Sequence, residues 1–431
     1  MSVKSSSGVV IVAVLALVPV AIWASMGPLG ARFATQAAAL RSFGQVSALA
    51  GTSLFAMTFI LNARLRFLEG FFGGMDKVFK AHHAAGAIAF VLLLAHPLLL
   101  AANYVTVSLA AAARFLMPGT DLLVTPGIIG LMLMFAFLAF TFYGKWKYPL
   151  WRRTHVLLGL AFIFAAYHVL IISSDVSASL PLRAYMDGMV FLGIAGYSYR
   201  TILGRYLVRR MEYTVSDVRE LGEGIVQITL NPLNGHMRFV PGQFLFVSFG
   251  DEAVGTEVHP FTISSSPDEG DLRLSIKAVG DYTSRLKILK RHTPARVEGP
   301  FGRFSYRLHP SEGYIWIAGG IGITPFLSMA RQLKKGGPGI DLYYSVKKKE
   351  EAVFLKEMME ISRRCPNLKV LPHYSDTGGF LNAEIIRSGS GLEGREIFIC
   401  GPPPMMLALR KRLMGLGVPK GKIHFEEFNL Q

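Results

Sequence analysis

The sequence predicts a membrane α-helical bundle of six transmembrane helices, followed by a small antiparallel β-barrel and an α/β doubly wound domain. Apolar runs long enough to cross a bilayer fill the first half of the chain. Short alternating runs separated by glycine and proline begin at about residue 211. From about residue 312, strand and helix patterns alternate. These three observations predict domains at residues 1–208, 209–308 and 309–431.

The composition supports a membrane protein and not a nucleic-acid-binding one. Of the 431 residues, 51% are hydrophobic and only 17% are charged, although the formal net charge is +16. Many of the basic residues lie in short loops between apolar runs, where they set the topology of the helices. The only two cysteines, Cys365 and Cys400, exclude a disulfide framework, a four-cysteine iron–sulfur cluster and a CxxCH attachment site.

Six apolar runs are expected to span the membrane. They are residues 8–26, 42–61, 81–102, 124–143, 154–173 and about 184–204. No clean small-residue cleavage site follows the first run, so we expect a retained helix and not a signal peptide. Asp187 and Arg200 make the sixth run the least regular. Lysine and arginine are concentrated in alternate loops, and this pattern predicts that both termini lie in the cytoplasm.

Two of these runs each carry a pair of histidines. His82 and His96 are 14 residues apart, and His155 and His168 are 13 apart. At 1.5 Å per residue, the members of a pair lie about 20 Å apart along a helix, so each helix offers one histidine near each membrane face. At 100° per residue, the second pair shares a face only if its helix is tilted or kinked. His83 is 13 residues from His96, so either neighbour could act in the first pair.

Four histidines at matched depths favour two haem irons with paired axial ligands, because neutral imidazole is a common haem ligand. The predicted pairs are His82 with His155 near the cytoplasmic face, and His96 with His168 near the outer face. Without a CxxCH motif, both haems would be bound non-covalently. Two alternatives stay open: individual histidines could hydrogen-bond between helices, or the four could relay protons or ions through the membrane.

The second half of the chain contains two kinds of strand. Six short alternating segments predict the antiparallel barrel: residues 213–221, 224–230, 242–249, 259–265, 272–279 and 294–302. Five more predict a parallel sheet with helices beginning near residues 325, 352, 382 and 404: residues 314–320, 340–346, 368–375, 395–401 and 422–428.

Residues 319–333 follow an apolar strand and open a helix. Gly319, Gly320 and Gly322 let the backbone approach a phosphate, and the helix N-terminus supplies free N–H donors. Pro325 suits the first helical turn. A later strand ends at residues 400–403, and in an open parallel sheet both motifs fall at the carboxyl ends of strands, where ligands bind. Together they predict a dinucleotide site.

Two further segments precede this site. Residues 259–267 read alone as a strand ended by serine and proline, and residues 277–290 contain a glycine turn that leads to Thr283, a candidate helix N-cap. The start of that helix could take a pyrophosphate. Because both segments come before a dinucleotide-binding pattern, they indicate a flavin site.

These motifs, in this order, resemble the ferric reductase and NADPH oxidase superfamily, in particular bacterial NADPH oxidase-like transmembrane flavocytochromes b. The resemblance covers nearly the whole chain and rests on the two histidine spacings and five short motifs, which are HPFT, GxYT, GGIGITP, CGPPPM and the terminal FEEF. It implies a di-haem helical bundle fused to a ferredoxin-reductase-like module, in which the β-barrel binds FAD and the α/β domain binds NADPH or NADH.

The resemblance also implies roles for single residues. It makes His82, and not His83, the inner ligand. It assigns the flavin contacts to His259, Pro260, Phe261 and Thr262, with Lys277, Gly280, Tyr282 and Thr283 toward the FAD phosphates. It assigns the nicotinamide nucleotide to Gly319, Gly320, Gly322, Thr324, Pro325, Cys400, Gly401 and Pro402. Phe428 resembles the C-terminal aromatic that stacks on the flavin, and Thr262, Cys400 and Phe428 are the expected catalytic residues.

The expected activity is transmembrane electron transfer. Cytoplasmic NAD(P)H would reduce FAD, and single electrons would pass through two haems to an acceptor at the outer face, with O2 giving superoxide as the leading case. A ferric, other metal or quinone reductase with the same electron path is the alternative. A membrane proton or ion pathway with a redox-sensing flavoprotein domain is a rival of another class.

The expected location is a bacterial inner membrane, with the FAD and NAD(P)H domains in the cytoplasm and lipid as the main partner. Lys347, Lys348 and Lys349 favour NADPH, whereas Asp376 argues for NADH, so both nucleotides stay open. The sequence gives neither the acceptor nor the oligomeric state.

Overall fold

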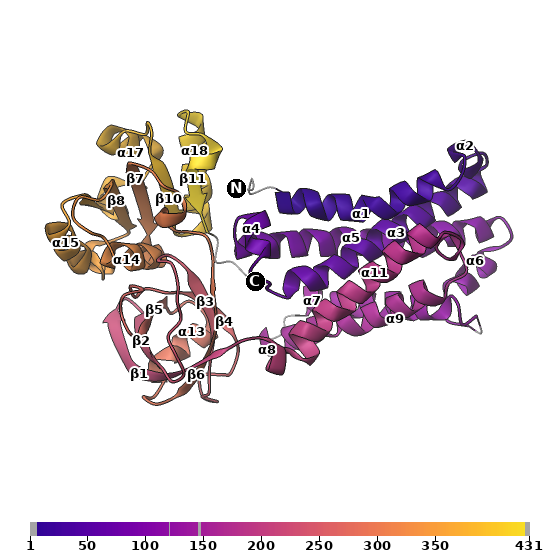
Figure 1. The fold of residues 1–431 in the computed structure, drawn as a ribbon, viewed down its shortest axis with the longest axis horizontal. Helices are drawn as coiled ribbons and strands as arrows, with labels where there is room; N and C mark the ends of the chain where they lie inside the picture. The colour runs from indigo at the N-terminus through magenta and orange to yellow at the C-terminus, as the bar shows by residue number, and fades with distance from the viewer. Residues whose placement is uncertain (1–6, 120, 145–147, 427–431) are drawn as a thin grey trace. The chain divides into compact units, whose positions relative to one another are not determined.

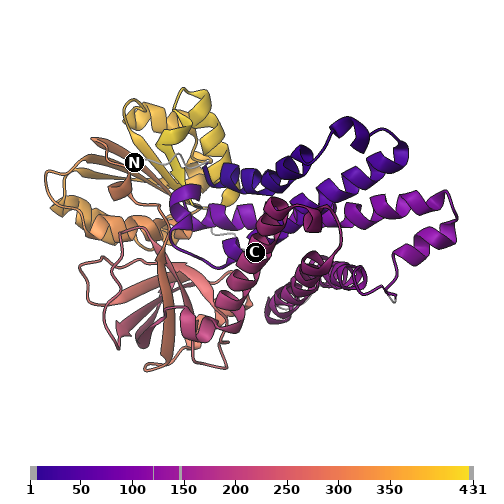
Figure 2. The ribbon, with the colours of Figure 1, turned by 45° about the vertical axis from the view of Figure 1, so that its right-hand side comes forward.

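Apolar helices build the first half of the chain and two β-sheets build the second. The computed structural model describes residues 7–119, 121–144 and 148–426, and the chain divides into two compact units, Met1–Val208 and Arg209–Gln431. Figures 1 and 2 show the first unit as a helical bundle and the second as two sheets with their own helices.

The first unit is entirely helical in its described residues. Its elements are α1 (Ser7–Ser25), α2 (Leu29–Arg32), α3 (Gln36–Asn62), α4 (Leu68–Phe72), α5 (Met75–Val105), α6 (Leu109–Phe115), α7 (Thr125–Tyr143), α8 (Tyr148–Val156), α9 (Leu158–Ile171), α10 (Asp175–Ala178), α11 (Leu180–Tyr197), the π-helical turn η1 (Ser198–Ile202) and α12 (Gly204–Leu207).

Five helical segments among the described residues are long and apolar enough to cross a membrane: α1, α3, α5, α7 and Leu150–Ile171, which joins α8 and α9. The predicted sixth span falls on α11, which does not meet the same measure. Arg183 and Asp187 lie in its first half, 3.7 Å apart, and their charges lower its hydropathy. Five predicted spans are therefore confirmed by length and composition, and the sixth stays a prediction.

Helix α3 lies at the centre of the bundle. The apolar window of α3 is 72% buried, against 17% for those of α5 and α7. Glycines allow the close approach: a Cβ added at Gly196 of α11 would lie 3.1 Å from the Phe59 carbonyl oxygen of α3, and one at Gly51 of α3 would lie 2.9 Å from Leu93 of α5. Small residues at helix contacts are typical of membrane bundles, where van der Waals packing holds the helices together.

The two histidine-bearing helices differ in regularity. α5 runs without interruption from Met75 to Val105 and contains both His82 and His96, whereas the other segment breaks at Leu157, between α8 and α9. His155 lies before this break and His168 after it. The helical segment that carries the second pair is thus interrupted between its two histidines.

The first sheet is antiparallel throughout, with the strand order β4-β3-β6-β1-β2-β5. Its strands are β1 (Met211–Gly222), β2 (Ile225–Pro232), β3 (Phe244–Phe249), β4 (His259–Thr262), β5 (Leu272–Lys277) and β6 (Pro294–Phe301), and α13 (Asp281–Arg285) follows β5. The edge strands β4 and β5 are not paired along their length, and an isolated bridge joins Ile263, just after β4, to Leu274. The predicted barrel is therefore only a half-barrel, although its six strands are confirmed.

The second sheet is parallel, with the order β11-β10-β7-β8-β9. Its strands are β7 (Gly313–Gly319), β8 (Gly339–Val346), β9 (Leu368–Tyr374), β10 (Glu396–Cys400) and β11 (Ile423–Phe425). The turn η4 (Gly320–Ile323) and the helices α14 (Thr324–Arg331), α15 (Leu355–Arg364), α16 (Ser375–Gly378), α17 (Ala383–Ser390) and α18 (Pro403–Gly415) connect them. From β7 the chain adds β8 and β9 on one side and then returns to add β10 and β11 on the other side, which confirms the doubly wound prediction.

Candidate functional site

The inner histidine pair faces one cavity in the helical unit. The ring centroids of His82 and His155 are 6.1 Å apart, and both side chains line a cavity together with Gly86 and Tyr197. His82 Nδ1 lies 2.9 Å from the Thr58 carbonyl oxygen of α3. Because a carbonyl only accepts, Nδ1 is the protonated nitrogen, and Nε2 keeps the lone pair that a metal ligand needs.

His155 is positioned by a different contact. The Trp151 ring stacks on it with centroids 5.3 Å apart and planes 6° from parallel. Its Nδ1 is buried and has no hydrogen-bond partner among the described residues. His83 is exposed, and its ring lies 5.6 Å from that of His82. His82 therefore lines the cavity beside His155, whereas His83 is not among the described residues that line it.

The outer pair repeats the hydrogen bond of His82. His96 Nδ1 lies 2.9 Å from the Gly44 carbonyl oxygen, and His168 Nδ1 lies 2.7 Å from that of Leu123. Each bond again leaves Nε2 for a metal. A Cβ added at Gly127 of α7 would lie 2.9 Å from His168 Cγ, so only glycine permits this approach.

These contacts fit haem better than a bare metal ion. Within the described part of the chain, no group of three or more His, Cys, Asp or Glu side chains could hold a metal. A haem needs only two axial side chains, since the porphyrin supplies the other ligands. Three of the four histidines carry the backbone hydrogen bond that fixes the tautomer of a ligating imidazole.

The predicted flavin motifs lie together in the antiparallel sheet. The His259 ring of β4 stacks on the Tyr282 ring of α13, with centroids 3.9 Å apart and planes at 26°. Tyr282 is 8% exposed, and its hydroxyl has no hydrogen-bond partner among the described residues. Burial, with a smaller effect of Glu257, raises the pKa of Tyr282, so it stays a neutral donor. This buried donor fits a site that a polar ligand completes.

The remaining flavin candidates surround this stack. Thr262 is buried at the end of β4 and pairs with Phe244 of β3. Pro260 is half-buried, and Phe261 packs against the core of the antiparallel sheet. Lys277 is exposed at the end of β5.

The predicted N-cap is wrong by three residues. Helix α13 begins at Asp281 and Gly280 is its N-cap, because Thr283 Oγ1 accepts hydrogen bonds from the N–H groups of Gly280 (3.0 Å) and Val279 (2.9 Å). A threonine at the third helical position can reach back in this way and satisfy free donors before the helix. Gly280 is exposed, and a Cβ there would meet no described atom within 4 Å.

The glycine turn of the parallel sheet lies against the end of β10. A Cβ at Gly322 would lie 2.2 Å from the Cys400 carbonyl oxygen, and one at Gly401 would lie 3.0 Å from Gly319 Cα. Gly320 has a φ of +56°, in the left-handed region that glycine favours. The two predicted nucleotide motifs are thus brought into backbone contact.

Several candidates complete this region. Thr324 Oγ1 donates to the Ile321 carbonyl (3.1 Å), and Pro325 lies in the first turn of α14, as predicted. Pro402 precedes α18. Cys400 is 3% exposed, and burial, with Glu426, raises the pKa of its thiol. Phe428, the third predicted catalytic residue, lies outside the described residues.

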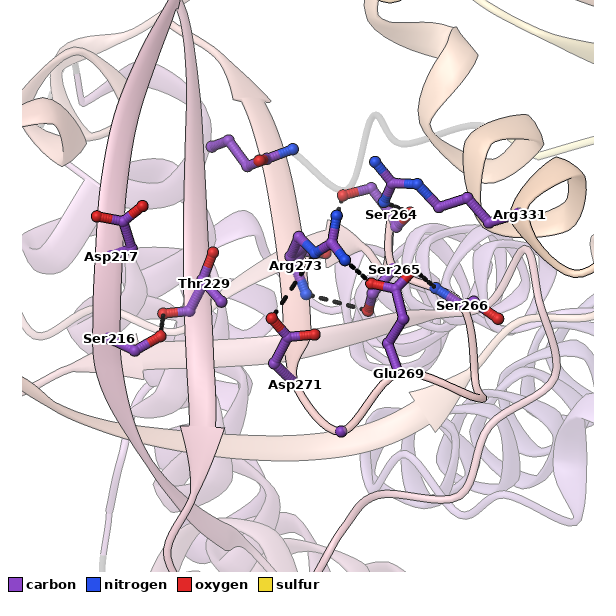
Figure 3. A network of polar contacts seen from close by, with 12 residues as sticks. Ser216, Asp217, Thr229, Ser264, Ser265, Ser266, Glu269, Asp271, Arg273 and Arg331 are labelled. Carbon is purple, nitrogen blue, oxygen red and sulfur yellow. Dashed lines mark hydrogen bonds and ion pairs between the residues drawn. The ribbon is translucent and has the colours of Figure 1, made fainter. Parts of the chain in front are cut away.

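Sequence reasoning missed the polar residues that join the two sheets. Ser328 of α14 donates to the Ser265 carbonyl oxygen, just after β4. Arg331 of the same helix donates to the Ser264 carbonyl oxygen (Figure 3). It also missed Trp151 beside His155. A serine and an arginine one turn apart in an otherwise apolar helix were the available signal for the first pair.

Comparison with known families agrees with this arrangement. The family model described as "Ferric reductase like transmembrane component" matches residues 47–166, the FAD-binding domain model matches residues 210–306, and the oxidoreductase NAD-binding domain model matches residues 316–411. Together the three matches agree with the ferric reductase and NADPH oxidase-like superfamily. The chain therefore combines a ferric-reductase-like transmembrane domain with an FAD-binding domain and an oxidoreductase NAD-binding domain.

Two curated relatives each match 44% of the chain. The ferredoxin reductase component of 3-ketosteroid-9-alpha-monooxygenase from Mycolicibacterium smegmatis is 29% identical over 199 residues, which cover 44% of this chain and 56% of that protein. The stachydrine N-demethylase reductase subunit of Rhizobium meliloti is 31% identical over 208 residues, with coverages of 44% and 58%. The chain thus spans less than three fifths of the length of these relatives.

One solved structure is similar over most of the chain. The flavohemoglobin of Malassezia yamatoensis, with bound FAD and heme, has a TM-score of 0.52 at 18% identity, over 91% of this chain and 98% of that one. At this identity the similarity concerns the fold alone.

Proposed function

We propose that the protein carries electrons across the membrane, from cytoplasmic NADPH or NADH through FAD and two b-type haems to O2 at the outer face, which becomes superoxide. The observation that carries this proposal is the imidazole arrangement on α5, α8 and α9. His82, His96 and His168 each direct Nδ1 to a backbone carbonyl and keep Nε2 for a metal.

The histidine-bearing segments would hold the haems as His82 with His155, and His96 with His168. Bound flavin would convert a two-electron hydride to single electrons, and bound haems would carry them across about 30 Å of hydrocarbon. Two axial histidines leave no open iron position, so reduction of O2 would be outer-sphere. Oxidation of one NAD(P)H would then yield two superoxide ions from two O2, with NAD(P)+ and one proton.

In the second unit, the residues of β4 and α13 would bind the flavin. Tyr282 and His259 form the stacked wall, and the buried Tyr282 hydroxyl would donate to it. Thr262 would meet the reactive edge of the ring. The turn at Gly320–Thr324 and the neighbouring Gly401 would hold the nicotinamide nucleotide, and Phe428 would cover the flavin until the nucleotide enters.

If the N-terminus and the second unit both lie in the cytoplasm, as proposed, the number of spans is even. Helix α11 would then be the sixth span. The Arg183–Asp187 pair supports this assignment, because opposite charges four residues apart on a helix reduce the cost of burying either one in the membrane. Met186 and Val190 of α11 are buried within the bundle, as expected of a member helix.

The structure brings both nucleotide-specificity candidates to one place. The Asp376 N–H donates to the Lys347 carbonyl oxygen at 3.2 Å, and Lys347, Lys348 and Lys349 are exposed. The lysines support NADPH, because they could neutralise a 2′-phosphate, whereas the Asp376 carboxylate supports NADH. We propose NADPH as the preferred electron donor, and the experiment below compares it with NADH.

The decisive experiment is a reduced-minus-oxidised spectrum of the purified protein, with NADPH and then NADH, under nitrogen and then under air. We expect a bis-imidazole haem spectrum that the nucleotide reduces under nitrogen and that air reoxidises with superoxide-dismutase-sensitive reduction of cytochrome c. His168→Ala should remove one haem equivalent, and His83→Ala, the matched control, should remove none.

Other outcomes separate the alternatives. Reoxidation by ferric chelates or quinones but not by air would identify a metal or quinone reductase. A protein purified from haem-rich cells without any Soret band would refute the electron path and favour a histidine proton pathway.

A further inference from the structure

A pair of side chains on α14 joins the parallel sheet to the segment that follows β4. Ser328 Oγ donates to the Ser265 carbonyl oxygen at 2.7 Å, and Arg331 Nη1 donates to that of Ser264 at 2.6 Å. Ser328 is fully buried. We call Ser328 and Arg331 the α14 clamp, and Figure 3 shows Arg331 beside Ser264.

The Arg331 end of the clamp is held rigidly. Its Nε and Nη2 donate to the two carboxylate oxygens of Glu357 on α15, at 2.7 Å and 3.0 Å. The Arg331 side chain is only 8% exposed. A two-point arginine–carboxylate pair fixes the orientation of the guanidinium plane, so the third bond, to Ser264, has a defined direction.

The segment that the clamp grips is itself stiff. The Arg273 N–H of β5 donates to Ser265 Oγ at 3.0 Å, Ser264 Oγ donates to the Arg273 carbonyl at 2.9 Å, and the Arg273 guanidinium pairs with Glu269. Figure 3 shows Arg273 among these side chains. A shift of the Ser264 carbonyl would therefore be passed to Thr262, two residues upstream, and not absorbed by a flexible loop.

Ser328, the other residue of the clamp, lies near the nucleotide turn in the chain. Thr324 opens α14, and Ser328 follows one helical turn later. Helix α14 thus follows directly on the Gly320–Thr324 turn at its N-terminus, and its side chains hydrogen-bond to residues 264 and 265. The β4 flavin segment and the nucleotide turn, which must approach each other for hydride transfer, are therefore both attached to α14.

We propose that Ser328 and Arg331 are positioning residues that set the distance between the β4 flavin segment and the nucleotide turn. This inference rests on the proposed NAD(P)H-to-FAD step. Neither residue is among the predicted cofactor contacts, so each ligand should still bind when the clamp is broken. What changes is the alignment of donor and acceptor, and a misplacement of about 1 Å can reduce a transfer rate about 100-fold.

The test uses the full-length, flavin-loaded protein with Arg331→Gln and Ser328→Ala. Anaerobic stopped-flow measurement of flavin absorbance gives the limiting rate of reduction by NADPH or NADH and the nucleotide Kd. We expect the rate to fall about 10- to 100-fold, with the Kd changed less than about threefold and the FAD content unchanged. Hydrogen–deuterium exchange of the peptide spanning residues 263–271 should also rise, which is a readout independent of activity.

Arg412→Gln is the matched control, because it removes an exposed arginine of α18 that is 3.9 Å from Glu384. It should leave the rate and the exchange unchanged. Wild-type reduction rates in both clamp variants, or a loss that lies wholly in Kd or FAD content, would overturn the inference. If Arg331→Gln fails to fold, Ser328→Ala decides, because it deletes a single oxygen. A wild-type protein that neither nucleotide reduces would instead refute the proposed function itself.

Discussion

Gly127 of α7 lies directly against the imidazole of His168, so Gly127→Ala is a structural test of the outer haem site. A Cβ at this position would lie 2.9 Å from both Cγ and Cδ2 of His168, and 3.2 Å from Nδ1. The Leu123 carbonyl, four residues before Gly127, accepts the Nδ1 hydrogen bond of His168 at 2.7 Å. The imidazole therefore cannot move away from the methyl group without losing that bond.

The size of the effect follows from the overlap. Carbon atoms in contact are ordinarily about 3.5–4.0 Å apart, so the ring or the helix must move by about half an ångström or more. Overpacking of this kind costs about 1–3 kcal/mol. If the strain is present only when His168 is in the position that binds the haem, the haem affinity of this site drops about 5- to 150-fold.

The assay is the haem content per polypeptide, from the pyridine haemochrome spectrum, together with a redox titration. Gly127→Ala should lose between a fraction and all of one haem equivalent, while the other haem keeps its midpoint potential. Gly188→Ala is the matched control, since a Cβ there meets no described atom within 4 Å. Two full haem equivalents with unchanged potentials in Gly127→Ala would show that His168 is not an axial ligand.

Three further predictions concern the second unit. Tyr282→Phe removes a buried donor and should weaken FAD binding about 3- to 10-fold while leaving the fold intact, since a hydrogen bond contributes about 1 kcal/mol. A fluorescence titration measures the affinity, and an unchanged value would mean that the hydroxyl does not contact the cofactor. Gly322→Ala places a Cβ 2.2 Å from the Cys400 carbonyl and should abolish nucleotide binding or lower the melting temperature by several degrees, measured by calorimetry. Burial, and then the adjacent His424, lower the pKa of His309 from 6.5 to about 4. The unfolded chain therefore binds this proton first as the pH falls, so stability is complete above pH 6.5 and declines toward pH 4, by about 1 kcal/mol at pH 5 after allowance for partial exposure. His309→Phe should flatten this part of the pH–stability curve, and an unchanged slope would contradict the assignment.

The strands and most of the helices could be predicted because their patterns are local. Period-two alternation identified all six strands of the first sheet, and length with hydropathy identified five spans. The sixth could not be decided in this way, since Arg183 and Asp187 interrupt its hydropathy and only their mutual contact explains why both are tolerated. The N-cap at Gly280 was missed because serine and threonine are the usual caps, and here Thr283 reaches back from within the helix.

The fine structure of the sites depends on contacts between segments far apart in the chain. Spacing alone left His82 and His83 equivalent. The distinction comes from Thr58, 24 residues upstream, whose carbonyl binds His82 only once α3 and α5 pack together. Spacing likewise called for a tilt or a kink between His155 and His168 but could not locate the helix break at Leu157. Such hydrogen bonds and breaks have no local signature, because they depend on which helices become neighbours.

Cys400 shows why residue type alone is a weak guide to a catalytic role. A reactive cysteine needs an accessible thiolate, but Cys400 is 3% exposed, and burial, with the Glu426 carboxylate, raises the pKa of its thiol. Hydride transfer requires no thiolate, so a neutral thiol is compatible with the proposed chemistry. The closest approach at this position is instead made by the backbone, where Gly322 meets the Cys400 carbonyl. The contact that the structure shows at Cys400 is therefore one of the backbone, between the end of β10 and the nucleotide turn, and not one of a reactive thiolate.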